Sequence, residues 1–186
     1  MGIAPVADWE HDLASILLTE DQIQSRVAEM AAELAEEYRD KHPLLIGVLK
    51  GSIVFLSDLM RRLNLPLEVD LVCCESYGHS ATSSGEVHLR LDLTQEIRDR
   101  HVLVVEDIVD TGVTLAWLRE RLWERQPASL RVCCLLSKPS RRLADLEPEH
   151  VGFEIPDAFV VGYGLDYAER YRWLPYVAVL KPEAYE

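Results

Sequence analysis

The segment from Val104 to Leu115 constrains the fold more than any other part of the chain. It begins as an apolar strand, passes through the acidic residues Glu106, Asp107 and Asp110, and enters a helix through Thr-Gly-x-Thr. A strand that leads into a helix through so short a turn is typical of α/β domains. In a doubly wound parallel sheet, ligands bind outside the carboxyl ends of the strands. The segment therefore predicts both a fold class and the location of a binding site.

The rest of the chain alternates between helical and strand patterns. Thr19 followed by Gln22 resembles a capping box and predicts the start of the first helix. Apolar spacing predicts helices over 23–38, 53–63 and 115–123, and strands over 44–49, 67–74, 87–91, 101–105, 130–136, 158–161 and 177–180. This alternation predicts an α/β fold with a mainly parallel twisted sheet flanked by helices. We expect a single domain over 1–186, with its core at about 17–182.

Composition and charge exclude several classes of protein. With 186 residues, of which 48% are hydrophobic and 27% charged, the chain can build a core. Its formal net charge of -13 opposes binding to nucleic acid and to anionic membranes. No apolar run reaches the roughly 18 residues of a membrane span, and the acidic start, with Asp8, Glu10 and Asp12, does not resemble a signal peptide. We therefore expect a cytoplasmic protein without nucleic-acid or membrane partners.

The turn that follows the acids predicts an anion site. A turn that opens a helix presents free backbone N–H groups, and Thr111 and Thr114 add hydroxyl donors. Gly112 permits a close approach of the backbone that a side chain would block. Glu106 and Asp107 suit vicinal hydroxyls, because carboxylates accept hydrogen bonds well. Phosphate donors beside hydroxyl acceptors describe a site for a ribose 5-phosphate.

A polar segment interrupts the compact pattern between residues 76 and 85. It reads Ser-Tyr-Gly-His-Ser-Ala-Thr-Ser-Ser-Gly, a composition that is typical of loops. Val87, Leu89 and Leu91 then alternate with polar residues, so the chain leaves the loop as a strand. We expect a hairpin with a long flexible tip, which is either a lid over a site or a plain surface loop.

The full string from Glu106 to Thr114, with Ile108 and Val113 inside it, resembles the phosphoribosyl pyrophosphate signature of type I phosphoribosyltransferases. The resemblance extends over about 17–182, nearly the whole chain. It implies the type I phosphoribosyltransferase fold, with a small hood formed by the terminal segments and a flexible hairpin loop. It also implies that the residues of this string bind the phosphoribosyl group.

Three further matches concern pyrophosphate. Leu49-Lys50-Gly51, directly after a predicted strand, resembles the pyrophosphate loop of the family, which implies that Lys50 and Gly51 bind this group. Ser76 and Tyr77 resemble the start of the family's flexible catalytic loop. Arg172 matches the arginine that contacts pyrophosphate. The resemblance therefore implies a leaving-group site assembled from three separate parts of the chain.

The matches on the base side are more specific. Residues 152–157 and 159–167 closely resemble the base-binding segment of hypoxanthine-guanine phosphoribosyltransferases. This resemblance implies that Phe159 stacks on a purine and that the backbone of Val160 meets the purine edge. Lys138 matches the lysine that reads the purine 6-oxo group. The implied cofactor is Mg2+, and the residues implied to bind it are Glu106, Asp107 and Asp166, the last of which also belongs to the purine site.

These matches imply an enzyme of purine salvage. It would transfer the 5-phosphoribosyl group from phosphoribosyl pyrophosphate to hypoxanthine and/or guanine, giving IMP or GMP and pyrophosphate. Asp110, on the base side of the ribose, is the expected general acid/base at the purine N7. The alternatives are a phosphoribosyltransferase that acts on another base, such as xanthine, and an RNA-binding regulator with the same fold. The family also implies a homodimer or homotetramer.

Overall fold

The computed structural model describes residues 9–76 and 87–185 of the chain. Its helices are α1 (Glu20–Glu37), α2 (Ile53–Leu63) and α3 (Val113–Trp123), with short 3-10 turns at η1 (Trp9–Asp12), η2 (Pro139–Arg141) and η3 (Pro182–Ala184). Its strands are β1 (Leu13–Leu18), β2 (Leu44–Leu49), β3 (Glu68–Ser76), β4 (Val87–Leu91), β5 (His101–Val109), β6 (Ser129–Ser137), β7 (His150–Glu154), β8 (Val160–Val161) and β9 (Val177–Leu180).

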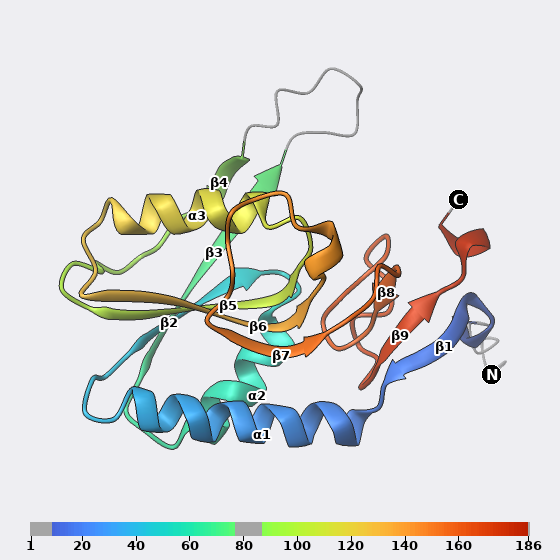
Figure 1. The fold of residues 1–186 in the computed structure, drawn as a ribbon, viewed down its shortest axis with the longest axis horizontal. Helices are drawn as coiled ribbons and strands as arrows, with labels where there is room; N and C mark the ends of the chain where they lie inside the picture. The colour runs from blue at the N-terminus through green and yellow to red at the C-terminus, as the bar shows by residue number, and fades with distance from the viewer. Residues whose placement is uncertain (1–8, 77–86, 186) are drawn as a thin grey trace, which may run out of the picture.

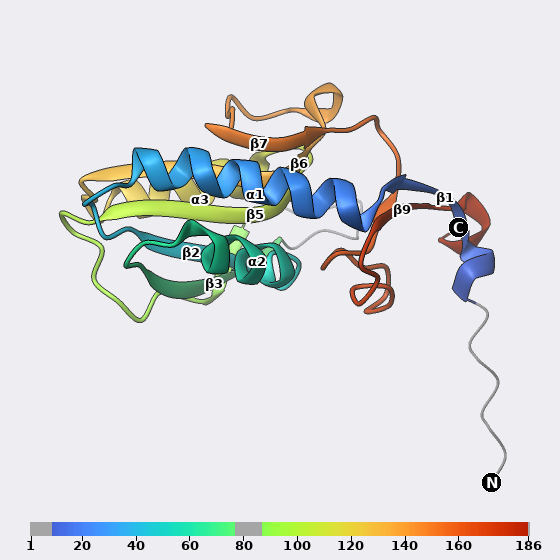
Figure 2. The same cartoon turned by 90° about the horizontal axis from the view of Figure 1, so that it is seen from below.

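A six-stranded sheet in the order β4-β3-β2-β5-β6-β7 forms the centre of the molecule. All of its strand pairs are parallel except β3 with β4, which are antiparallel. Figure 1 shows α3 on one face of this sheet and α1 with α2 on the other, and Figure 2 shows the α1 and α2 side from below. The predicted fold class, a mainly parallel sheet flanked by helices, is therefore confirmed.

Both faces of the central sheet are buried, each in its own hydrophobic cluster. Neighbouring residues of a strand point to opposite faces, so Leu103 packs with α1 and α2 while Val104 packs with α3. Burial on both sides explains why the central strand β2 and the first part of β5 are almost continuously apolar. Fully burying one such side chain stabilises the fold by about 1.5–3 kcal/mol. Within the described residues, no helix is long and apolar enough to cross a membrane.

Helix α1 shows how local sequence sets an element. The Thr19 side chain accepts a hydrogen bond from the Gln22 backbone N–H at 3.3 Å, and the Gln22 side chain accepts one from the Thr19 N–H at 2.9 Å. This reciprocal pair is the capping box that the sequence predicts. The apolar residues that recur at helical spacing after it are buried against the sheet: Ile23, Val27, Met30, Ala31 and Leu34.

A second, three-stranded sheet lies at the carboxyl-end side of the main one. Its strand order is β1-β9-β8, and both strand pairs are antiparallel. Strands β1 and β9 come from opposite ends of the chain and lie side by side in Figure 1. This sheet is the small hood of terminal segments that the type I fold implies.

The structure differs from the sequence-based expectation in strand β5. The apolar run predicts a strand over 101–105, but β5 continues to Val109. Pairing with β6 causes the extension, because Glu106 still pairs with Cys134 and Val109 with Ser137. Glu106 and Asp107 therefore lie on the strand and not beyond its end. The predicted loop tip over 77–85 lies outside the described residues, although the β3–β4 hairpin that leads to it is present.

Candidate active site

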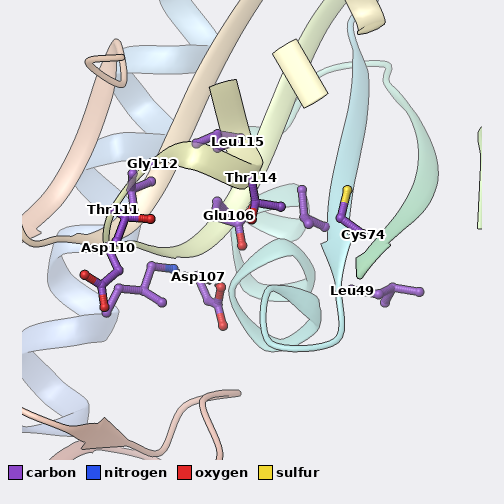
Figure 3. Close-up of a pocket in the computed structure, with 12 residues that line it drawn as sticks. Leu49, Cys74, Glu106, Asp107, Asp110, Thr111, Gly112, Thr114 and Leu115 are labelled. Atoms are coloured by element: carbon purple, nitrogen blue, oxygen red, sulfur yellow. Dashed lines mark hydrogen bonds between the residues drawn. The ribbon is translucent and has the colours of Figure 1, made fainter. Parts of the chain in front are cut away.

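A cavity of about 260 Å³ lies where β5 turns into α3. The end of β2 borders it, because β2 and β5 are adjacent parallel strands whose carboxyl ends meet at the same edge. Figure 3 shows Glu106, Asp107, Thr111 and Thr114 around one common space, with Asp110 at its margin. The complete lining is Val48, Leu49, Cys74, Glu106, Asp107, Ile108, Val109, Asp110, Thr111, Gly112, Thr114 and Leu115.

The acid pair on β5 is held in a desolvated place. Only 9% of Asp107 is exposed, and its carboxylate accepts a hydrogen bond from the Ile108 N–H at 2.9 Å. Burial raises the pKa of Glu106 well above its ordinary value, and the neighbouring Asp107 charge adds to the effect. Burial also raises the pKa of Asp107, whereas the Arg172 guanidinium opposes that shift. Two crowded carboxylates of this kind are stabilised by a cation or by hydroxyl donors.

The turn after β5 presents backbone N–H groups to the cavity. Gly112 caps α3 with φ +78°, a left-handed conformation that favours glycine. The Thr111 carbonyl holds the turn in place by accepting hydrogen bonds from the N–H groups of Leu143 at 2.9 Å and Ala144 at 3.1 Å. The N-cap Gly112 has no side chain to cap α3, and the Val113 N–H makes only a long contact of 3.5 Å with Thr111 Oγ1, so the start of the helix can accept an anion.

Asp110 joins this cavity to a second one. Arg141 Nε donates to Asp110 Oδ1 at 2.7 Å, and Lys138 Nζ lies 3.7 Å from Asp110 Oδ2. Among the lining residues drawn in Figure 3, the Asp110 carboxylate lies at the edge that is farther from Glu106. The second cavity, of about 410 Å³, is lined by Asp110, Lys138, Arg141, Asp157, Ala158, Phe159 and Tyr185.

The second cavity combines a buried cation with aromatic rings. Lys138 is only 6% exposed, and its ammonium lies between the carboxylates of Asp110 at 3.7 Å and Asp157 at 3.8 Å. The Phe159 ring stacks on Tyr185, with centroids 4.7 Å apart and planes inclined by 20°. Tyr167 meets Phe159 edge-on at 5.6 Å. This arrangement suits a flat, polar ring, because it offers stacking surface beside one fixed hydrogen-bond donor.

The backbone of Val160 faces away from β9, the one strand that pairs with β8 among the described residues. The Leu180 N–H donates to the Phe159 carbonyl at 2.8 Å, and Val160 is paired with Val179 in the antiparallel ladder. Because hydrogen-bonded and non-hydrogen-bonded pairs alternate, Val160 belongs to a non-hydrogen-bonded pair. Its own N–H and C=O therefore point off the free edge of β8, where a ligand can reach them.

The residues expected around pyrophosphate lie on the other side of the acid pair. The peptide bond between Leu49 and Lys50 is cis. A Cβ atom on Gly51 would lie 1.6 Å from the Asp107 carboxylate, so only glycine permits this approach. Lys50 Nζ lies 2.7 Å from Glu169 Oε1, and Arg172 Nη2 lies 3.3 Å from Glu169 Oε2. Glu169 thus connects two residues that are 122 positions apart (172 − 50).

Some predicted site residues are not brought together. The Asp166 carboxylate lies 2.7 Å from Arg172 Nη2 and accepts a hydrogen bond from the Glu169 N–H at 2.9 Å, and within the described residues it forms no hydrogen bond with Glu106 or Asp107. The same part of the chain contains no group of three or more His, Cys, Asp or Glu residues arranged to hold a metal ion. Ser76 ends β3, and Tyr77 lies outside the described residues.

Several contacting residues were not predicted. Arg141 and Tyr185 line the second cavity, and Glu169 bridges the two cations; Asp157, which also lines this cavity, lies in the segment 152–157 that was expected to bind the base. Arg141 lies three positions after Lys138, and this spacing is the one sequence signal that places it near the base side. No signal in the sequence indicates that Tyr185, near the end of the chain, stacks on Phe159.

A mainly parallel α/β sheet with a helix-opening turn beside an acid pair at its carboxyl edge is typical of the phosphoribosyltransferase class. The phosphoribosyl transferase domain family matches residues 14–168, and the chain belongs to this family. The hypoxanthine-guanine phosphoribosyltransferase of Bacillus subtilis is 51% identical over 177 residues, which cover 95% of this chain and 98% of the relative. The enzyme of the same name from Mycobacterium avium is 48% identical over 188 residues, covering 98% and 93% of the two chains.

Solved structures agree with these relatives. The crystal structure of a hypoxanthine phosphoribosyltransferase from Staphylococcus aureus superposes with a TM-score of 0.93 at 45% identity. The alignment covers 98% of this chain and 100% of the S. aureus chain. The family that the sequence motifs resemble, and the fold that the resemblance implies, are therefore both confirmed.

Proposed function

We propose that the chain is a hypoxanthine-guanine phosphoribosyltransferase of purine salvage, acting in the cytoplasm. It transfers the 5-phosphoribosyl group from phosphoribosyl pyrophosphate to hypoxanthine and/or guanine, giving IMP or GMP and pyrophosphate. The observation that carries the proposal is Asp110, which lines both the cavity at the phosphate turn and the aromatic cavity with the buried Lys138. One carboxylate between a sugar-phosphate site and a ring site suits a reaction that joins the two.

The strand-turn segment, 106–114, holds the phosphoribosyl group. The N–H groups of Gly112 and Val113 and the hydroxyls of Thr111 and Thr114 surround the 5-phosphate at the start of α3, and Ile108, on β5, lines the same cavity. The carboxylates of Glu106 and Asp107 accept hydrogen bonds from the ribose hydroxyls. Holding the sugar at several points fixes the anomeric carbon in front of the base cavity.

The second cavity holds the purine. Phe159 stacks on the ring, the Val160 backbone meets its edge, and Lys138 donates to the 6-oxo group. A purine nitrogen then bonds to the anomeric carbon while the bond to pyrophosphate breaks. Asp110 takes the N7 proton as this bond forms, a role that is typically worth 10²–10⁴-fold in rate.

The donor set fits Mg2+ that arrives with its substrate. Magnesium is usually bound by one or two carboxylates together with waters and substrate phosphates, and Glu106 and Asp107 are two adjacent carboxylates in the cavity. Bound there, the ion would neutralise charge on the leaving group. Lys50, the Gly51 backbone and Arg172 hold pyrophosphate beside it, and Asp166 acts through its ion pair with Arg172.

Steady-state assays of hypoxanthine, guanine, xanthine and adenine, each with phosphoribosyl pyrophosphate and Mg2+, test the proposal. We expect nucleotide formation with hypoxanthine or guanine and little with adenine. Turnover of xanthine or another base alone would favour a phosphoribosyltransferase of different specificity. No turnover together with RNA binding in a gel-shift assay would favour a regulator, which the net charge of -13 opposes.

A further inference from the structure

The Glu169 carboxylate contacts both cationic side chains of the proposed pyrophosphate site, Lys50 and Arg172. Its Oε1 lies 2.7 Å from Lys50 Nζ, and its Oε2 lies 3.3 Å from Arg172 Nη2. Each carboxylate oxygen therefore faces a different cation, as two oxygens of a bound phosphate would. The Lys50 ammonium, followed by Arg172, holds the pKa of the Glu169 carboxyl below its ordinary value, so the group is anionic when it makes these contacts.

The charges of this cluster cancel. Lys50 and Arg172 carry two positive charges, while Glu169 and Asp166 carry two negative ones. An incoming pyrophosphate therefore meets a neutral group of side chains inside a chain whose net charge is -13. The attraction of the cluster for the anion becomes stronger when one of the two carboxylates leaves it.

The two carboxylates differ in how firmly they are held. Asp166 and Arg172 are 28% and 25% exposed, and Arg172 Nη1 also donates to the Gly164 carbonyl at 2.8 Å. Glu169 and Lys50 are 65% and 60% exposed. Exposed ion pairs are weak and open easily. The Glu169 backbone, in contrast, is tied down, because its N–H donates to Asp166 at 2.9 Å. The Glu169 side chain is therefore the part that can swing away while the loop remains in place.

We propose that the Glu169 carboxylate is an internal stand-in for pyrophosphate. In the free enzyme it holds Lys50 and Arg172 together, and it is displaced when the diphosphate group of a substrate or product binds. The proposal rests on the proposed function, since that function places pyrophosphate at these two cations. Glu169 acts through Lys50 and Arg172 and is a positioning residue. Its return to the cations promotes the release of pyrophosphate after each turnover.

The test is titration calorimetry of pyrophosphate with Mg2+ into the full-length chain and its Glu169→Gln variant. Glutamine keeps the length of the side chain and removes the charge that competes with the ligand. We expect pyrophosphate to bind the variant at least about fivefold more tightly, which is about 1 kcal/mol at 1.4 kcal/mol per tenfold. The KM for phosphoribosyl pyrophosphate should fall in parallel, kcat should fall or stay unchanged, and the KM for hypoxanthine should not move.

Two further variants separate charge from structure. Glu169→Asp keeps the negative charge and should bind pyrophosphate within about twofold of the parent chain. Glu124→Gln removes an exposed glutamate that pairs with Arg121 at 3.1 Å on α3 and its C-cap, away from the cluster, and should leave affinity unchanged. Thermal unfolding of all three variants checks that each is folded at the temperature of the titration.

Unchanged or weaker pyrophosphate binding by a folded Glu169→Gln variant overturns the inference, because Glu169 would then support the cations and not compete for them. The proposed function fails in a different way. If the parent chain neither binds pyrophosphate nor forms a nucleotide, the proposed function is wrong and the inference falls with it. A parent chain that forms nucleotide normally, with an unaffected Glu169→Gln variant, contradicts the inference alone.

Discussion

The two halves of the candidate site are built in different ways. The strand-turn segment, 106–114, lies on one continuous strand, turn and helix. The residues proposed to bind the base and pyrophosphate form a dispersed set that comes from four separate places: Lys50, Lys138, Phe159 and Arg172. A continuous segment has its geometry set by local backbone conformation. A dispersed set depends on the whole topology, which brings the ends of β2, β5, β6 and the β8 region together.

This difference predicts different responses to mutation. In the strand-turn segment many donors are backbone N–H groups at the start of α3, so loss of one side chain leaves most of them in place. In the dispersed set each function depends on one side chain, such as the buried ammonium of Lys138, which follows the end of β6. Substitutions in the dispersed set should therefore separate base recognition from phosphate binding.

Asp110 belongs to both halves, and its substitution should have the largest effect. Asp110→Asn should lower kcat by about 10²-fold or more, because a general acid/base is lost. Affinity for phosphoribosyl pyrophosphate should change little, since the turn donors remain. Single-turnover kinetics and calorimetry measure the two quantities. Asp145→Asn, an exposed acid in the loop after Arg141, is the matched control. A near-normal kcat for Asp110→Asn would remove this residue from the proton-transfer role.

Lys138→Met tests the dispersed set alone. It should reduce kcat/KM for hypoxanthine and guanine by about tenfold to a hundredfold, the value of a hydrogen bond to a charged group. The gap between these bases and adenine should shrink, because the ammonium has donors and no acceptor. Phe159→Ala is the control and should harm all purines alike. If the variant kept the preference for oxopurines, the backbone of Val160, and not Lys138, would be the group that selects the base.

Gly112→Ala probes the backbone of the strand-turn segment and should have a smaller effect. Alanine at φ +78° is strained by about 1–2 kcal/mol, and its Cβ would lie 3.0 Å from Arg142 Cδ. We expect the free energy of unfolding to fall by about 1 kcal/mol. Affinity for IMP should fall about fivefold, while inosine, which lacks the phosphate, should bind as before. Equal losses for IMP and inosine would show that the turn does not hold the 5-phosphate.

Local sequence patterns predicted the elements whose conformation depends on their own residues, and they missed elements that depend on pairing with distant strands. The helix after Thr19 and the strand Leu44–Leu49 follow directly from capping and apolar spacing. Strands β1 and β7 were not predicted, because β1 is largely exposed and β7 is short and contains Gly152. Their strand conformation comes from pairing with β9 and β6, and such long-range pairing leaves little local signal.

The residues of the candidate site also differ in how far local sequence predicts them. The prediction of a ribose 5-phosphate site at residues 106–114 follows from their spacing alone, because a strand, an acid pair and Thr-Gly-x-Thr stand in one continuous segment. Lys138 and Arg172 were assigned only through resemblance to a family. Glu169 and Tyr185 were not predicted at all, since their importance lies in contacts with Lys50, Arg172 and Phe159 that only the folded chain creates. The roles of all these residues stay predictions until they are tested.

The central claim is that the strand-turn segment binds ribose 5-phosphate independently of the dispersed set. Calorimetric titration of ribose 5-phosphate into three variants tests it most directly: Lys138→Met, Phe159→Ala and the double variant Thr111→Ala with Thr114→Ala. The account predicts that Kd for the first two stays within about twofold of the parent value, and that Kd for the double variant rises at least about tenfold through lost hydrogen bonds to a charged group. The account would be contradicted if Lys138→Met or Phe159→Ala raised the Kd for ribose 5-phosphate as much as the double variant does.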